Sequence, residues 1–359
     1  MHDLSSTQQS TNTHILTFIR VIATMALETK PRLPWKVRFS TSILSAISDI
    51  TGRSNGTINR RLLSFIDWKM PPNPNSKSIN GVSSSDVVVD PTCNLWFRLF
   101  LPSSSTTATT KSLPVIIFFH GGGYAYMSPS SIPYHMLCRL FCRSFPAIVV
   151  SVNYGLSPEH RFPSQYEDGL KILKFLDQNV DVLGKYADIS KCFLAGDSAG
   201  GNLAHHVAAR VSLEDFRVLK VIGLVSIQPF FGGEERTESE IRLKRVPICS
   251  MDKTDWYWKM FLPDGSNRDH EASNVCGPNA MDISNVDYPN TLVCVGGCDP
   301  LVDWQKRYYE WLRKSGKEVQ LIEYPNMVHA FFYFPDLPET LDLISKVKDF
   351  MIKQMVAMN

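Results

Sequence analysis

A serine flanked by glycines, between an apolar run and a helix-like run, constrains this chain more than any other feature. Gly196-Asp197-Ser198-Ala199-Gly200 is a G-x-S-x-G pentapeptide. The apolar run from Cys192 to Ala195 precedes it, and residues Asn202 to Val211 follow with a helical pattern. A sharp strand-to-helix turn of this kind strains the backbone of the serine and exposes its hydroxyl above a sheet. The motif predicts a nucleophilic Ser198, with a glycine-rich structural turn as the alternative.

After Leu113, short apolar runs alternate with amphipathic runs. We expect strands at 115–119, 147–153, 191–195, 218–227, 291–295 and 319–324. Helices are expected at 132–145, 164–178, 199–213, 304–314 and 339–357. Two further strands are predicted upstream, at 86–89 and 95–101. Such alternation is typical of an α/β fold, with a mostly parallel sheet covered by helices on both faces.

The first quarter of the chain has a different pattern. Residues 1–35 begin with a polar, aperiodic stretch and are predicted to be a mobile tail. Residues 36–50 and 57–68 carry apolar residues at helical spacing, which predicts two amphipathic helices. With the Pro/Asn/Ser-rich linker that follows them, these helices are expected to form a cap over residues 36–85.

The α/β domain is expected to span residues 86–359, with an irregular insertion at 228–289. This insertion and the cap helices together are predicted to form a lid. Within the insertion, Trp256, Tyr257 and Trp258 form an aromatic run. We expect this run to pack between the insertion and the sheet, with the lining of a pocket as the alternative.

Composition argues against several partners and locations. The net charge is only +2 over 359 residues, so no field for nucleic acid is expected. Ile15 to Leu27 is apolar, but it is interrupted by Arg20 and is shorter than the roughly 20 residues that a bilayer span needs. We therefore expect no nucleic-acid partner, no membrane span and no secretion. A cytoplasmic location is predicted, with the nucleus as a further option, and the sequence does not fix the oligomeric state.

The eight cysteines are scattered, and several lie in apolar strand-like runs. Buried thiols in a reducing compartment are the expected reading of this pattern. No C-x-x-C pair, zinc-ligand spacing or G-x-G-x-x-G dinucleotide motif occurs in the sequence. We therefore expect neither a metal nor a cofactor.

A serine nucleophile needs a base, and His329 is the best-placed histidine. It follows the last predicted strand, at the carboxyl end where an α/β sheet presents its site. His205 and His206 lie on the helix after Ser198, some 10–12 Å along it. A packed loop histidine is the alternative for His329.

The base in turn needs an acid to orient it. Asp299 lies shortly after the predicted strand at 291–295, at the end of the short segment GGCD that follows it. It also fits a helix N-cap, because Pro300 follows it. Asp303 is the rival acid, although its position suggests a helical turn. We prefer Asp299, and the order serine, acid, histidine is that of α/β-hydrolases.

A third segment can supply hydrogen-bond donors to an oxyanion. His120-Gly121-Gly122-Gly123 directly follows the predicted strand at 115–119. Glycines let a backbone approach a ligand closely and direct its N–H groups at it. Ala199 supplies the amide that follows the nucleophile. A flexible loop is the alternative for the glycines.

Five segments together resemble the hormone-sensitive-lipase-like serine hydrolases, above all their plant carboxylesterase branch. They are HGGGYAYMSP, NYGLSPEHRFPSQYEDG, GDSAGGNLAHH, GGCDPLVDWQ and YPNMVHAFFYFP. The resemblance covers residues 57–352 and implies an α/β-hydrolase fold with an N-terminal helical cap. It also implies a catalytic triad of Ser198 as nucleophile, Asp299 as acid and His329 as base. The implied oxyanion hole consists of the amides of Gly122, Gly123 and Ala199, with Gly121 adjacent to it.

Two family positions are implied to be structural, namely Asp197 and Glu159. The family usually has an arginine where this chain has Gly155, which leaves a salt bridge there in doubt.

The function implied is that of a carboxylesterase, which hydrolyses small-molecule esters through an acyl-enzyme. The same branch contains the soluble gibberellin receptors, which resemble the enzymes but have lost the catalytic histidine. His329 is present in this chain, which favours an enzyme. A catalytically idle small-molecule receptor, and a cyclising or eliminating enzyme with the same triad, are the alternatives.

Overall fold

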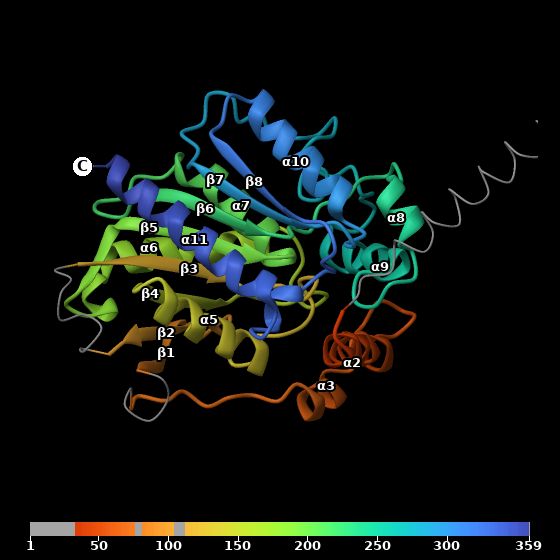
Figure 1. Cartoon of the computed structure of the whole chain (residues 1–359), viewed down its shortest axis with the longest axis horizontal. Helices are drawn as coiled ribbons and strands as arrows, with labels where there is room; N and C mark the ends of the chain where they lie inside the picture. Colours follow the sequence, from red (N-terminus) through yellow and green to blue (C-terminus); the bar gives the residue numbers. More distant parts are fainter. Residues whose placement is uncertain (1–32, 76–80, 104–111, 359) are drawn as a thin grey trace, which may run out of the picture.

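An eight-stranded sheet forms the centre of this computed structural model, which describes residues 33–75, 81–103 and 112–358. The strand order is β1-β2-β4-β3-β5-β6-β7-β8 (Figure 1). All pairs from β4 to β8 are parallel, whereas β2 is antiparallel to both β1 and β4. The strands are β1 (Val82–Asp90), β2 (Leu95–Pro102), β3 (Leu113–Phe119), β4 (Ile148–Asn153), β5 (Ala187–Asp197), β6 (Val221–Ile227), β7 (Thr291–Gly296) and β8 (Val319–Tyr324). The predicted α/β class with a mostly parallel sheet is confirmed.

Helices cover both faces of this sheet. One face carries α5 (Ile132–Ser144) and α11 (Pro338–Ala357), which lie in front of the strands in Figure 1. The opposite face carries α6 (Ser164–Gln178), α7 (Ala199–Val211) and α10 (Val302–Lys314). Each of these helices was expected from its apolar periodicity, and their observed ends differ from the predicted ones by two residues at most.

The side chains of β3 show how one strand serves both layers. Val115, Ile117 and Phe119 join the core under α6 and α7, whereas Ile116 and Phe118 join the core under α5 and α11. Successive residues of a strand point to opposite faces, so a strand buried on both sides has to be apolar throughout.

The sheet begins earlier than the sequence predicts. The first strand was expected at 86–89, but β1 begins at Val82, and Ser83 pairs with Leu101. Serine is a weak strand former, so the run of serines before Asp86 gave no signal. The well-patterned neighbour β2 imposes the pairing instead, and the linker after the cap therefore ends before Val82 rather than at residue 85.

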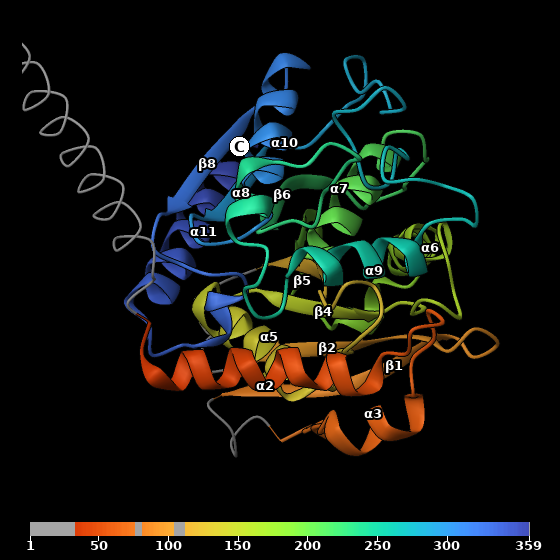
Figure 2. The same ribbon diagram turned by 90° about the vertical axis from the view of Figure 1, so that its right-hand side faces the viewer.

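The cap consists of α2 (Trp35–Thr51) and α3 (Arg60–Ile66), close to the predicted ranges. Figure 2 shows α2 lying between α3 and α9 (Met251–Phe261), the aromatic helix of the insertion. Lys253 of α9 donates to the carbonyl of Ser45 and lies 2.8 Å from Asp49, so the insertion holds the cap helix. Residues 1–32 of the expected mobile tail lie outside the described residues, and α2 already begins at Trp35.

A short helix in the insertion, α8 (Glu238–Arg242), was not predicted. Its signal was present as Thr237 and Glu240, which form a capping box at its first turn. Five residues are too few for an apolar period to show. Two 3-10 turns, at Val180–Leu183 and Phe331–Tyr333, complete the described elements.

Arg60 ties the cap to the body of the molecule. Its guanidinium donates to Glu159 and to the carbonyl oxygens of Ala125 and Ser157. Gly155 itself has no side chain to form a salt bridge, and nearby Glu159 pairs with an arginine of the cap instead. A Cβ at Gly155 would lie 2.9 Å from the ring of His160, so the chain there has no room for a larger residue.

The described parts of the chain contain no helix of the length and apolarity that crossing a membrane requires. All eight cysteines are free thiols, and six of them are buried, as expected from their apolar surroundings.

Candidate active site

Ser198 lies at the turn between β5 and α7. Its φ of 51° and ψ of −121° are strained for a residue with a side chain. The flanking glycines permit this turn, because a Cβ on Gly196 would lie 2.2 Å from the carbonyl oxygen of Gly200. A Cβ on Gly200 would lie 1.9 Å from the carbonyl oxygen of Phe119 on β3. The motif therefore lets the first turn of α7 pack directly against two strand ends.

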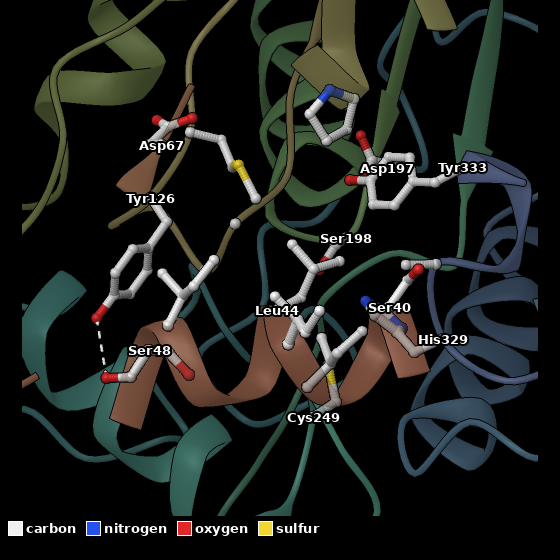
Figure 3. A pocket seen from close by; sticks show the side chains of 18 of the residues that line it. Ser40, Leu44, Ser48, Asp67, Tyr126, Asp197, Ser198, Cys249, His329 and Tyr333 are labelled. Atoms are coloured by element: carbon white, nitrogen blue, oxygen red, sulfur yellow. Dashed lines mark hydrogen bonds between the residues drawn. The ribbon is translucent and has the colours of Figure 1, made fainter. Parts of the chain in front are cut away.

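The structure brings Asp299 and His329 together from the carboxyl ends of β7 and β8. Nδ1 of His329 lies 2.7 Å from Oδ2 of Asp299, and both side chains are buried. Ser198 and His329 line the same cavity under Leu44 of α2 (Figure 3). Among the described residues, no hydrogen bond joins the hydroxyl of Ser198 to His329; such contacts often tighten only when substrate binds.

The carboxylate of Asp299 is held by three further donors. The side-chain amides of Gln228 and Gln305 donate to Oδ2, at 3.2 and 2.9 Å, and the amide of Leu301 donates to Oδ1. The rival Asp303 points elsewhere, because its Oδ2 accepts from the amide of Ser239 in α8. The geometry thus favours Asp299 over Asp303 as the partner of the imidazole.

Gln228 also fixes the loop that carries His329. Its Oε1 accepts from the amide of Ala330, and its Nε2 donates to the carbonyl of Val328. Sequence reasoning missed Gln228 and Gln305. Gln228 immediately follows β6, and a polar residue at that strand's carboxyl end was the available signal. Gln305 lies within α10, where a lone glutamine carries no signal.

Two opposing effects set the basicity of His329. Burial alone lowers the pKa of the imidazole, because it penalises the cation. The adjacent Asp299 carboxylate and the Cys249 thiol beside the ring together outweigh burial, so the pKa of His329 is raised well above its usual value. A ring with a raised pKa accepts a proton readily, as a general base must.

The glycine loop after β3 presents two unused amides to the cavity. Gly122 and Gly123 have φ values of 102° and 61°, a region that favours glycine. Neither amide has a hydrogen-bond partner among the described residues. The amide of Ala199 opens α7, so it has no acceptor within the helix. The three amides predicted as an oxyanion hole therefore all have unused N–H groups beside Ser198.

Replacing Gly123 with alanine is expected to lower kcat for ester hydrolysis by about 10²- to 10³-fold, with little change in KM. A Cβ there would lie 2.6 Å from the ring of Tyr257, and φ is 61°, so the amide would have to move. Steady-state kinetics with a p-nitrophenyl ester would measure the effect. The matched control is Gly265→Ala, at a glycine with φ 84° where an added Cβ would meet no atom of the described residues within 4 Å. It should lose stability but keep its activity, and equal kcat values for the two variants would contradict the assignment of Gly123.

The amide of Gly121, which was predicted to lie next to the oxyanion hole and not within it, already has hydrogen-bond acceptors. It donates to the hydroxyl of Tyr134 and to Oδ1 of Asp197. The hydroxyls of Tyr134 and Tyr333 both donate to Oδ2 of Asp197. Asp197 therefore connects the glycine loop, the turn that carries Ser198 and the loop that carries His329, which agrees with its implied structural role. The two tyrosines gave no signal in the sequence.

Burial raises the pKa of Asp197 to about 6, against the opposing effect of its tyrosine hydrogen bonds. Since this folded-state pKa is above the usual value of 3.8, the folded state binds the proton more tightly than the unfolded chain. The contribution of Asp197 to stability therefore becomes less favourable as pH rises from about 4 to about 6.

The cavity beside Ser198 has a volume of about 530 Å³ and a mostly apolar lining. Residues of α2 form one wall, among them Ser40, Leu44 and Ser48 (Figure 3). Its other lining residues include Ile66, Asp67, Tyr126, Ile132, Phe230, Cys249 and Tyr333. The cap helices thus complete a site whose chemical groups come from the sheet.

The aromatic run of the insertion divides between the two predicted roles. Trp258 is buried and stacks on Phe230, as expected for packing. Tyr257 lines the cavity beside Ser198, which was the alternative. Trp256 lies on the outer side of α9, near Gly52 of the cap.

Besides His135, three other buried histidines make their contacts outside the cavity beside Ser198. His205 shares a hydrogen bond with the hydroxyl of Tyr288, and His206 stacks on Tyr166. His120 stacks on Tyr154. Burial lowers the pKa of both His120 and His205 to about 3, so each stays neutral near pH 7. None of the three lines the cavity beside Ser198.

A family model described as the alpha/beta hydrolase fold matches residues 116–333, the part of the chain that carries this site. The chain therefore belongs to the α/β-hydrolase family. Within this family, the gibberellin receptor GID1C of Arabidopsis thaliana is 38% identical over 320 residues, covering 86% of this chain and 92% of the receptor. Carboxylesterase 20 of the same plant is 38% identical over 283 residues, covering 76% of this chain and 86% of that protein.

Solved structures agree with this placement. An esterase from Pyrobaculum calidifontis superposes with a TM-score of 0.66 at 26% identity, covering 92% of this chain and 95% of the esterase. The resemblance to plant carboxylesterases and gibberellin receptors, inferred from five motifs, is confirmed by these relatives. This α/β-hydrolase thus has both enzymes and receptors among its relatives.

Proposed function

We propose that the protein is a serine carboxylesterase that hydrolyses small-molecule esters. The observation that carries this proposal is the buried pair of His329 and Asp299, 2.7 Å apart, beside the strained Ser198. A protein that only binds a ligand has no need of a histidine whose pKa a carboxylate raises. The carboxylesterases among the relatives support the same reaction class.

In the proposed mechanism, Nε2 of His329 removes the proton from Ser198 as its Oγ attacks the ester carbonyl. The carbonyl oxygen becomes an oxyanion and accepts hydrogen bonds from the amides of Gly122, Gly123 and Ala199. His329 then gives its proton to the departing alcohol, which leaves an acyl group on Ser198. Water, deprotonated by His329, attacks this acyl-enzyme, the bond from the acyl carbon to Oγ breaks, and His329 returns the proton to Ser198 as the acid leaves.

Throughout this cycle Asp299 holds Nδ1–H of the imidazole and stabilises the cation that forms. Gln228 and Gln305 keep the carboxylate in place. The apolar walls of the cavity favour an ester with an apolar acyl or alcohol group, and the volume of about 530 Å³ limits its size. No step of this mechanism needs a metal or cofactor.

A fluorophosphonate probe tests the proposal directly, because it reacts only with an activated serine. We expect the wild-type protein to be labelled at Ser198 within minutes, together with turnover of short-acyl p-nitrophenyl esters. A His329→Asn variant should show neither, since its serine has no base. A wild-type protein that resists the probe and turns over no ester in an acyl-length panel would refute the proposal.

A small-molecule receptor is the second candidate function, because a relative at 38% identity is a gibberellin receptor. Under this alternative, the cavity would bind a ligand and release it unchanged. Ligand binding measured by calorimetry, without product in the same sample by mass spectrometry, would favour the receptor. A product formed by cyclisation or elimination would instead favour the remaining alternative, a cyclising or eliminating enzyme with the same triad.

A further inference from the structure

The outer side of the cap exposes an unusual number of large apolar side chains. On α2, Trp35, Phe39, Ile43 and Ile50 are 72, 61, 45 and 62% exposed. Their spacing of three to four residues, or multiples of it, places them on one stripe of the helix. The adjoining side of α2 faces the cavity, through Leu44, Ser48 and others. The helix is therefore apolar on two sides, and only one of them is covered by described residues.

This stripe continues around the mouth of the cavity. Ile43, Trp68 and Ile132 line the cavity and are nevertheless 45, 72 and 36% exposed, so they form its rim. Met136, 49% exposed, lies with Ile43 and Ile132 along an adjoining apolar groove. We call these exposed apolar residues the cap face: Trp35, Phe39, Ile43, Ile50, Trp68, Ile132 and Met136.

Positive charge is concentrated in the same part of the chain. Residues 33–70 contain six Lys/Arg and two Asp/Glu, an excess of four, although the whole chain has a net charge of only +2. Both acids are paired, Asp67 with Lys69 and Asp49 with Lys253. Four exposed cations of the cap have no acidic partner among the described residues: Lys36, Arg38, Arg53 and Arg61.

Exposed tryptophan and phenylalanine next to unpaired lysine and arginine are typical of helices that lie in the interface of an anionic bilayer. Aromatic rings insert at the level of the headgroups, and cations meet the negative surface of the lipid. A second copy of the chain fits less well, because two cap faces would bring like charges together. The excess charge and the aromatic rings thus indicate the same partner.

We propose that the cap face docks on an anionic lipid surface, with the mouth of the cavity turned toward the bilayer. Because Ile43, Trp68 and Ile132 belong both to the cap face and to the cavity, an apolar molecule dissolved in lipid would reach Ser198 without crossing water. Docking does not depend on hydrolysis, so the proposal stands or falls separately from the proposed function.

Co-sedimentation of the full chain with vesicles tests this docking. Binding to vesicles of phosphatidylcholine with phosphatidylserine should exceed binding to phosphatidylcholine alone by about 10-fold at low salt, and should fall as salt rises. A Ser198→Ala variant should bind as the wild type does, which separates docking from catalysis. Equal binding to both kinds of vesicle, or none, would overturn the proposal.

Two variants and a matched control assign the surface. Phe39→Ser should lose most of the binding because it removes an inserting ring, and Arg38→Glu should lose the preference for phosphatidylserine. Leu213→Ser removes a side chain that is 71% exposed but lies beyond α7, and it should bind normally. Undiminished binding by Phe39→Ser would refute the role of the cap face. So would a wild-type dimer in light scattering that Phe39→Ser dissociates, because a second copy would then occupy this face.

Discussion

A Ser198→Ala variant is expected to hydrolyse p-nitrophenyl butyrate at least ~10⁴-fold more slowly than the wild-type chain. Without the hydroxyl, no acyl-enzyme forms, and only the amides of the oxyanion hole remain to assist attack by water. Ser198 is only 8% exposed, and the substitution removes a single oxygen from the cavity wall, so ligand binding should survive. kcat and KM measured over the same ester series would separate the two effects.

Ser226→Ala is the matched control for this substitution. Ser226 is a buried serine on β6, and its hydroxyl finds no hydrogen-bond partner in the described part of the chain. Loss of an unsatisfied hydroxyl costs little or even stabilises the fold, so activity should stay at the wild-type level. If Ser198→Ala retained turnover within about tenfold of wild type, while Ser226→Ala behaved normally, Ser198 would not be the nucleophile.

The site was predictable from sequence where backbone geometry restricts residue choice. Gly196 and Gly200 cannot carry a Cβ at their close approaches, and Gly122 and Gly123 have positive φ, so these glycines leave a motif in the sequence. His329 could be found because it follows a strand with a clear apolar pattern. In each of these cases the local backbone, a tight glycine turn or a strand end, restricts the sequence at the position where a reactive side chain or amide of the candidate site lies.

Residues that act by meeting across the fold left no such motif. Gln228, Gln305, Tyr134 and Tyr333 come from four separate elements, and their hydrogen bonds to Asp299 and Asp197 depend on tertiary packing. A single glutamine or tyrosine has no spacing to recognise. The same holds for the partner of Glu159, because Arg60 reaches it across 99 positions of sequence.

The cap shows a further limit of pattern reading. Its two helices were expected from apolar periodicity, yet that periodicity predicts one buried face and α2 has two apolar sides. One side closes the cavity over Ser198, and the other is exposed as part of the cap face. Periodicity alone could not show that no described element covers the second side.

An Asp299→Asn variant is expected to lower kcat by about 10³- to 10⁴-fold and to change the pH dependence of what remains. In the wild type, the Asp299 carboxylate raises the pKa of His329, and only the neutral ring can accept the proton of Ser198. Activity should therefore rise with pH through this elevated pKa. Without the carboxylate the pKa of His329 falls, so the residual activity should reach its plateau at lower pH.

The same pair makes a prediction for stability. The folded-state pKa of His329 exceeds that of the unfolded chain, which is about 6.5. The pair of Asp299 and His329 therefore stabilises the fold fully below pH 6.5, and this stabilisation is lost as pH rises through the folded-state pKa. Wild type should thus exceed Asp299→Asn in unfolding free energy by more at pH 6 than at pH 9. Asp303→Asn is the control, because that carboxylate accepts from Ser239 and does not touch the imidazole. A pH–rate profile that shifts in Asp303→Asn but not in Asp299→Asn would assign the acid to Asp303 instead.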